Sequence, residues 1–296
     1  MVESLSIILW SVGAVIGQGQ KVVGVWLAVT VPRVSTAVDR TRMEQDQLTA
    51  EREAFDEFAK RVAALDPDRH TARDEYESSP PATGEGVTTI VDSVGHPSRS
   101  TIDAGSVSIS VVREAYRETV MAVPHYEEEY GESIDENLTA ELGPDAARAL
   151  IEGDVLTQQI QAAILNQAQR ASKQRRDLLS HVETEHESLV EARRRLRDLH
   201  ETATTIEDDL YPRPVRELVQ SWTRLEAATT DCKTRLCERQ ARLQKEHETG
   251  TMSTWSFQEY LYQPFQWRHP VLNDGLETLK RIRRAKRETV RAIYNW

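Results

Sequence analysis

The chain has 296 residues, of which 39% are apolar and 29% charged, so its composition argues against one thick hydrophobic core and favours helical structure with a large surface. The formal net charge of −11 argues against nucleic-acid binding, because affinity for phosphate depends on clustered positive charge. Two cysteines, Cys232 and Cys237, cannot make a disulfide framework or a four-ligand zinc site, and we expect the bulk of the chain in the reducing cytoplasm.

Residues 1–32 form an apolar segment, and its part from 5 to 31 is long enough to cross a bilayer, which needs about 20 apolar residues. Gln18, Gln20 and Lys21 interrupt its centre and make insertion costly. A secretory signal is not expected, because the chain starts with an acidic rather than a basic region. If the segment spans a membrane, the arginines that follow it place the C-terminal part in the cytoplasm. A buried helical hairpin and a start codon placed too early stay open as alternatives.

Residues 33–65 are predicted to form one long amphipathic helix, because their larger apolar side chains recur at helical spacing through charged sequence. Pro67 predicts the end of this helix, because proline lacks the amide proton that a helix needs. Residues 66–106 are rich in Gly, Pro, Ser, Thr and Asp and have few large apolar side chains to offset the entropy of ordering, so we predict a flexible linker. Residues 107–296 are predicted to form a helical domain.

Residues 124–133, with the sequence PHYEEEYGES, bring one histidine, two tyrosines and four carboxylates together. A capping box that starts at Ser133 predicts that this stretch separates two helices. His125 with Glu128 or Glu129 is the first candidate for metal binding or proton transfer. A lone histidine beside carboxylates is more often structural, so the sequence assigns no metal site here.

Residues 178–243 carry apolar side chains at alternating spacings of three and four, interrupted by a proline turn at 211–214, and this pattern predicts an antiparallel coiled-coil hairpin. Glu185 occupies a seam position and Arg239 fits the seam poorly. Polar seam residues weaken a stand-alone dimer and favour packing against further helices. The predicted fold is therefore mainly α: an elongated helical bundle with an antiparallel coiled-coil hairpin and a flexible linker.

Glu183 and His186 form a second candidate metal pair, because they have the Glu-x-x-His spacing of di-iron helical bundles. If Val182 lies at the seam, however, both side chains fall away from it, and only one such motif is present where two are needed. Glycine-rich phosphate loops, Gly-x-Ser-x-Gly and His-Glu-x-x-His are absent from the sequence. We therefore assign no catalytic, metal-binding or cofactor-binding residue and infer no small-molecule ligand.

The C-terminal segment, residues 255–296, begins with a concentration of aromatic side chains and continues with a basic stretch from 280 to 291. The aromatic part is predicted to be a core that docks onto the bundle, with a ligand groove as the alternative. The basic part fits either a membrane-surface or nucleic-acid contact or a solvated helix face that pairs with the acidic body.

The stretches AEREAFDEFAKRV, VREAYRETVMAVPHYEEEYGES with AELGPD, and EYLYQPFQWRHPVL follow one another in an order that resembles an uncharacterised family of haloarchaeal helical proteins, a domain of unknown function. The resemblance covers residues 34–296. It implies a soluble helical scaffold from a salt-adapted cytoplasm and implies no activity, cofactor or catalytic residue. The apolar residues 1–32 depart from that pattern.

The sequence predicts a non-enzymatic scaffold or adaptor that acts through coiled-coil contacts with a protein partner or with a second copy of itself. Residues 5–31 offer this scaffold a membrane tether. The alternative prediction is a metal-dependent or hydrolytic enzyme that uses His125 with Glu129, or Glu183 with His186.

Overall fold

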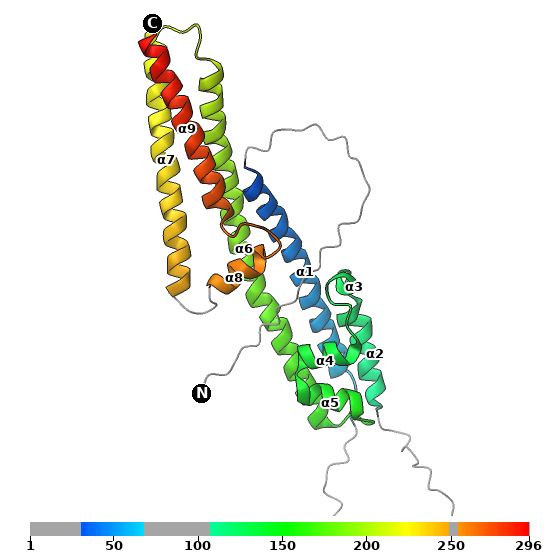
Figure 1. Cartoon of the computed structure of the whole chain (residues 1–296). Coiled ribbons are helices and arrows are strands. Elements are labelled where there is room, and N and C mark those ends of the chain that lie inside the picture. The colour runs from blue at the N-terminus through cyan, green and yellow to red at the C-terminus, as the bar shows by residue number, and fades with distance from the viewer. Residues whose placement is uncertain (1–30, 68–106, 249–253, 296) are drawn as a thin grey trace, which may run out of the picture. The chain divides into compact units, whose positions relative to one another are not determined.

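The computed structural model describes residues 31–67, 107–248 and 254–295, and these residues form helices without any sheet. The prediction of a mainly α fold is confirmed. The long helices α1, α6, α7 and α9 pack antiparallel (Figure 1). The elements are α1 (Pro32–Ala63), α2 (Ile109–Thr119), the 3-10 helix η1 (Val120–Ala122), α3 (Tyr126–Glu129), α4 (Ile134–Leu142), α5 (Pro144–Glu152), α6 (Gln158–Asp208), α7 (Val215–Glu248), α8 (Thr254–Tyr262) and α9 (Pro270–Tyr294).

The chain divides into two compact units, each with its own core. Of the described residues, the first unit comprises 31–48, 177–248 and 254–295, and the second comprises 49–67 and 107–176. Helix α1 confirms the predicted amphipathic helix, and it ends before Pro67 as expected. Its apolar side chains enter the core of the first unit at Val34 and Val38 and the core of the second at Phe55, Phe58 and Val62.

The predicted linker, residues 66–106, lies outside the described residues except for its first two positions. Residues 5–30 of the candidate membrane segment also lie outside the described residues. Among the residues that the structure describes, we find no helix that is both long enough and apolar enough to span a bilayer.

The second unit is a cluster of short helices on the second half of α1 and the first part of α6. Phe58 and Tyr116 meet edge to face in its core, with ring centroids 5.1 Å apart, and the Tyr116 hydroxyl donates to Asn137 Oδ1 over 2.6 Å. Local sequence sets the helix ends. Ser133 caps α4 through the predicted capping box, and Gly143, at φ +82°, separates α4 from α5, which opens with Pro144.

The first unit contains the predicted reversal of the chain between α6 and α7. Helix α6 starts at Gln158, well before the predicted hairpin, and runs for 51 residues. The predicted packing of the hairpin against further helices is confirmed by α9, which lies closer to α7 than α6 does. At Gly275 of α9 an added Cβ would come within 2.4 Å of Leu236 Cδ2, so a larger residue there would force the Leu236 side chain to move.

The aromatic part of the C-terminal segment docks onto this unit as predicted. Phe257 and Tyr262 are buried, and Phe265 stacks on Trp267 with ring centroids 4.5 Å apart. The basic stretch forms part of α9, whose apolar side faces the core. Several of its cations pair with acidic residues of the bundle: Arg281 and Arg284 with Glu207, and Lys286 with Glu226. These pairs agree with the interpretation of the stretch as a solvated helix face.

A buried ion pair explains the polar residues in the predicted seam. The carboxylate of Glu185 accepts two hydrogen bonds from Arg239, at 2.7 and 2.9 Å, and a third from the Tyr262 hydroxyl at 2.7 Å. Only 7% of the Glu185 side chain and 6% of the Arg239 side chain are exposed. Because every hydrogen bond to a buried carboxylate lowers the cost of its desolvation, the two misfits in the heptad pattern compensate each other.

Replacing Arg239 with methionine should lower the free energy of unfolding of the first unit by about 3–5 kcal/mol, because it leaves Glu185 charged in the core without its main partner. The triple variant R239M/E185L/Y262F should recover most of that loss, since no buried charge remains. Urea unfolding followed by tryptophan fluorescence, to which Trp222 and Trp267 of this unit contribute, measures both values. A triple variant less stable than R239M would contradict this account.

Candidate functional site

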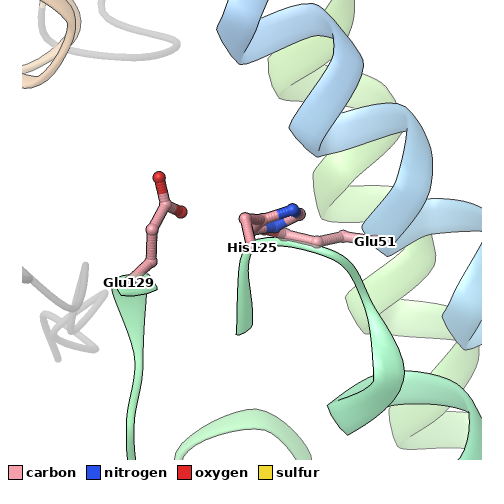
Figure 2. Close-up of side chains that lie close together, drawn as sticks. All are labelled: Glu51, His125 and Glu129. Atoms are coloured by element: carbon pink, nitrogen blue, oxygen red, sulfur yellow. The ribbon is translucent and has the colours of Figure 1, made fainter. Parts of the chain in front are cut away.

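His125 and Glu51 form the centre of the candidate site, in the second unit. Figure 2 shows the Glu51 side chain reaching from α1 toward the imidazole of His125, with Glu129 on the other side of His125 from α1. His125 Nε2 lies 2.9 Å from Glu51 Oε1, and each side chain is 11% exposed. One ligand atom from each of Glu51, His125 and Glu129 can be chosen so that all lie within 4.8 Å of one another. The structure thus brings together the predicted pair His125 and Glu129 and adds Glu51.

The local sequence fixes His125 and Glu129 on one side of α3. His125 is the N-cap of this short helix, and its carbonyl oxygen accepts a hydrogen bond from the Glu129 amide over 3.0 Å. Residues four apart on a helix lie one above the other, so both side chains can face α1. Tyr126 and Tyr130 stack at 5.4 Å between ring centroids and hold the same turn in place. Glu128, the other predicted partner, is exposed and does not belong to the cluster.

An arginine holds the second oxygen of Glu51. Arg175 of α6 donates from Nε to Glu51 Oε2 over 3.0 Å and from Nη2 to Glu141 Oε1 over 2.7 Å, and its guanidinium lies 4.9 Å from the ring centre of Phe55. One guanidinium therefore bridges two carboxylates from different helices. This bridge fixes the orientation of Glu51 and leaves its other oxygen, Oε1, directed at His125.

The environment keeps Glu51 ionised. Burial raises the pKa of its carboxyl, but the hydrogen bond from His125 and the charge of Arg175, with further hydrogen bonds from Arg175 and Tyr130, outweigh burial and hold the pKa below its ordinary value of 4.5. The Tyr130 hydroxyl, 2.9 Å from Glu51 Oε1, stays protonated because burial and the nearby carboxylate raise its pKa. An ionised carboxylate beside a neutral phenol and an imidazole can bind a cation or exchange a proton with the histidine.

The second predicted pair is not brought together with a third metal ligand in the described part of the chain. Glu183 is exposed, as its position outside the hairpin seam predicts. His186 is half-buried, and its Nδ1 lies 2.8 Å from the Thr41 hydroxyl of α1. This histidine therefore serves a contact between two helices of the first unit.

Sequence reasoning missed three members of the site: Glu51, Arg175 and Glu141. They lie on α1, α6 and α4, and Glu51 is 74 residues from His125. Arg175 and Glu141 stand among many other charged residues, so no local spacing distinguishes them. The one available signal is that Glu51 and Phe55 are four apart on α1, which puts the carboxylate on the same side as a buried aromatic ring.

A different kind of feature lies on α7 in the first unit. A shallow depression of about 610 Å³ follows one face of this helix. Its lining residues recur at helical spacing and are mostly small or apolar: Trp222, Thr223, Glu226, Ala227, Thr230, Asp231 and Thr234. The predicted alternative of a ligand groove among the C-terminal aromatic residues does not correspond to this place, since all seven residues belong to α7.

Glu51 should make the free energy of unfolding of the second unit fall as the pH is lowered. Because its pKa is lower in the folded chain than in the unfolded chain, its contribution is present above about pH 4.5 and is lost as the pH falls through the folded pKa. Glu51→Gln should cost about 3 kcal/mol at pH 7 and should reduce the further loss between pH 7 and pH 3. Denaturant unfolding at several pH values, followed by far-ultraviolet circular dichroism, measures both.

Glu53→Gln is the matched control, because Glu53 lies on the same helix but is exposed and pairs with Arg52 at the surface. We expect it to leave both stability and pH dependence unchanged. Equal effects of the two substitutions would show that Glu51 has no special role.

A protein family described as "Domain of unknown function (DUF7260)" matches residues 32–286. No curated protein and no solved structure matches the chain. The family match begins at the first residue of α1 and ends inside α9, so it includes His125, Glu51 and the depression on α7. The taxon suggested by the resemblance stays a prediction. Because the match covers most of its length, this chain belongs to the DUF7260 family of domains of unknown function.

Proposed function

We propose that this chain is a non-enzymatic helical scaffold that binds an amphipathic helix of another protein along the exposed face of α7. The depression on this helix is the observation that carries the proposal. From Trp222 to Thr234 it follows α7 over 13 residues, and the 12 steps between its ends span about 18 Å at 1.5 Å per step. Val219, 48% exposed, extends the apolar character of the helix one turn further toward its N-terminus.

The shape and lining of the depression favour a helix as its occupant. Thr223, Ala227, Thr230 and Thr234 are small, and small side chains let the backbone of a second helix approach closely. Trp222 at one end is only half-buried and offers a large apolar ring, with Lys286 Nζ 4.7 Å from its centre. Partly exposed aromatic rings of this kind are common anchors in protein interfaces.

Helix α7 already accepts a helix on another of its faces. Its buried Ala228 and Cys232 face α9, and the Cys232 thiol reaches the carbonyl oxygen of Gly275 at 3.5 Å. This close approach depends on the absence of a side chain at Gly275. A partner helix in the depression would likewise approach α7 closely over small side chains, but on a different side of α7.

The scaffold would work in the cytoplasm, as the cysteine content of the chain suggests. Residues 5–31, most of which lie outside the described part, would tether it if they cross a membrane. The tether is independent of the α7 surface, so the proposal of a helix partner does not depend on it.

The proposal can be tested by placing a photo-crosslinking amino acid at Thr223, Ala227 or Thr230 in full-length protein in its native cells. We expect all three positions to crosslink to one segment of a different protein, at residues spaced three or four apart. Mapping the crosslinked peptides by mass spectrometry reads out that spacing. Crosslinks to a second copy of this chain, or to no defined segment, would overturn the proposal.

Asp198, exposed on α6, is the control position for the crosslinker, and we expect no crosslink to the same segment from there. Ala227→Arg in combination with a crosslinker at Thr223 should reduce the yield on the order of tenfold, as for an interface residue worth more than 1 kcal/mol. Ala227 is exposed, so the helical spectrum of the variant should match the unsubstituted chain.

A further inference from the structure

We propose that Glu51, His125 and Glu129 bind a divalent transition-metal cation, of which Zn²⁺ is the best fit. The proposal does not follow from a scaffold role, since nothing on the α7 surface requires a metal. It rests on the distances within the cluster, on the burial of two of its members and on the arginine that holds Glu51.

The distance between His125 Nε2 and Glu51 Oε1 already suits two ligands of one cation. Bonds of about 2.1 Å from a tetrahedral Zn²⁺ to nitrogen and oxygen put neighbouring ligands about 3.4 Å apart. The two atoms lie 2.9 Å apart, so a separation of the two side-chain ends by about 0.5 Å lets a cation replace the shared proton. One carboxylate oxygen of Glu129 lies within 4.8 Å of the ligand atoms of both residues, so Glu129 is the third ligand of the proposed site.

The surroundings of Glu51 resemble the outer shell of a metal site. Metal-bound carboxylates are usually held by a hydrogen bond to the oxygen that does not bind, because this fixes the direction of the other oxygen. Arg175 supplies that bond to Oε2 and is itself fixed by Glu141. The arginine thus orients Glu51 without occupying Oε1, the oxygen that faces the histidine.

Charge also favours a cation at this point. Among Glu51, Glu129, Glu141 and Arg175, three groups are acidic and one is basic, so these four groups together attract positive charge. The small exposure of Glu51 and His125, 11% each, weakens the screening of that attraction by water.

The choice of ligands selects the class of metal. An imidazole nitrogen favours zinc and its neighbours in the first transition row over Mg²⁺ and Ca²⁺, which prefer oxygen ligands alone. Binding replaces the contacts that His125 and Tyr130 make with Glu51 Oε1. It also requires an unprotonated imidazole, so affinity should fall as the pH is lowered.

Isothermal titration of the full-length chain with Zn²⁺ after removal of metal by a chelator tests the proposal. We expect one site that is absent in Glu129→Gln, or weakened at least about tenfold. His125→Asn should have the same effect. Because Glu129 is only half-buried, its substitution should not unfold the chain, and circular dichroism checks this. Titration with Mg²⁺ should give no binding at this site.

Titration with Co²⁺ adds a readout that a structural role alone would not move. Bound Co²⁺ absorbs visible light, and loss of a ligand changes the position and strength of its bands. The matched control is His186→Asn, since His186 is also half-buried but contacts Thr41 rather than a carboxylate cluster. It should leave the titration and the spectrum unchanged. A chain that binds no stoichiometric Zn²⁺, or a Glu129→Gln variant that binds it as tightly as the unsubstituted chain, would overturn the proposal.

Discussion

The pairing of buried glutamates with arginine and tyrosine is the interaction on which both units depend. Helices as rich in charge as these cannot bury a wide apolar face without also burying some carboxylates, and a buried carboxylate without partners costs several kcal/mol. The first unit contains two buried glutamates with such partners. Glu185 binds Arg239 and Tyr262, and Glu44 binds Arg40 and Tyr260. In the second unit, Arg175 and Tyr130 are the corresponding partners of Glu51.

These three clusters share a chemical logic that follows from the donors involved. Arginine neutralises the charge of the carboxylate and offers several N–H groups, while tyrosine adds a hydrogen bond together with a large apolar ring. Burial and the nearby carboxylates raise the pKa of both Tyr130 and Tyr262, so each hydroxyl keeps its proton and remains a donor. Such a cluster joins helices that are far apart in sequence. Its hydrogen bonds fix the relative orientation of these helices more strictly than apolar contacts do.

The cluster around Glu51 differs from the other two because it contains groups that can bind a metal ion as well as groups that stabilise the fold. Glu185 accepts hydrogen bonds from a guanidinium and from a phenol that stays protonated, and neither of these groups is a usual metal ligand. Glu51 in addition faces His125, whose imidazole can either donate a hydrogen bond or bind a cation, and Glu129 stands next to it. For this reason the buried pair in the first unit is assigned to folding, while the one in the second unit supports a metal site.

Local patterns in the sequence predicted the features that residues close together in the chain determine. They did not predict the contacts that a third helix makes. The α1 stripe, the Ser133 capping box and the reversal after α6 were all found, because each is set by residues within a few positions of one another. Arg239 looked like a poor seam residue because the hairpin was treated as two helices, whereas its partner set includes Tyr262 from α8. His186 was placed away from the seam for the same reason, and it contacts α1.

The way charge is distributed also determines how the fold would respond to salt. Many surface ion pairs, such as Arg194 with Glu191, are exposed and join residues of one helix, so ions in solution screen them; at molar salt the screening length is only about 3 Å. The pairs at Glu185 and Glu51 are shielded by protein and are screened far less. At molar salt the buried clusters and the apolar cores would therefore carry the tertiary structure, while the exposed charges would serve mainly to keep the helices hydrated. The small-residue face of α7 is suited to the same conditions, because contacts between apolar and small side chains do not weaken as salt rises.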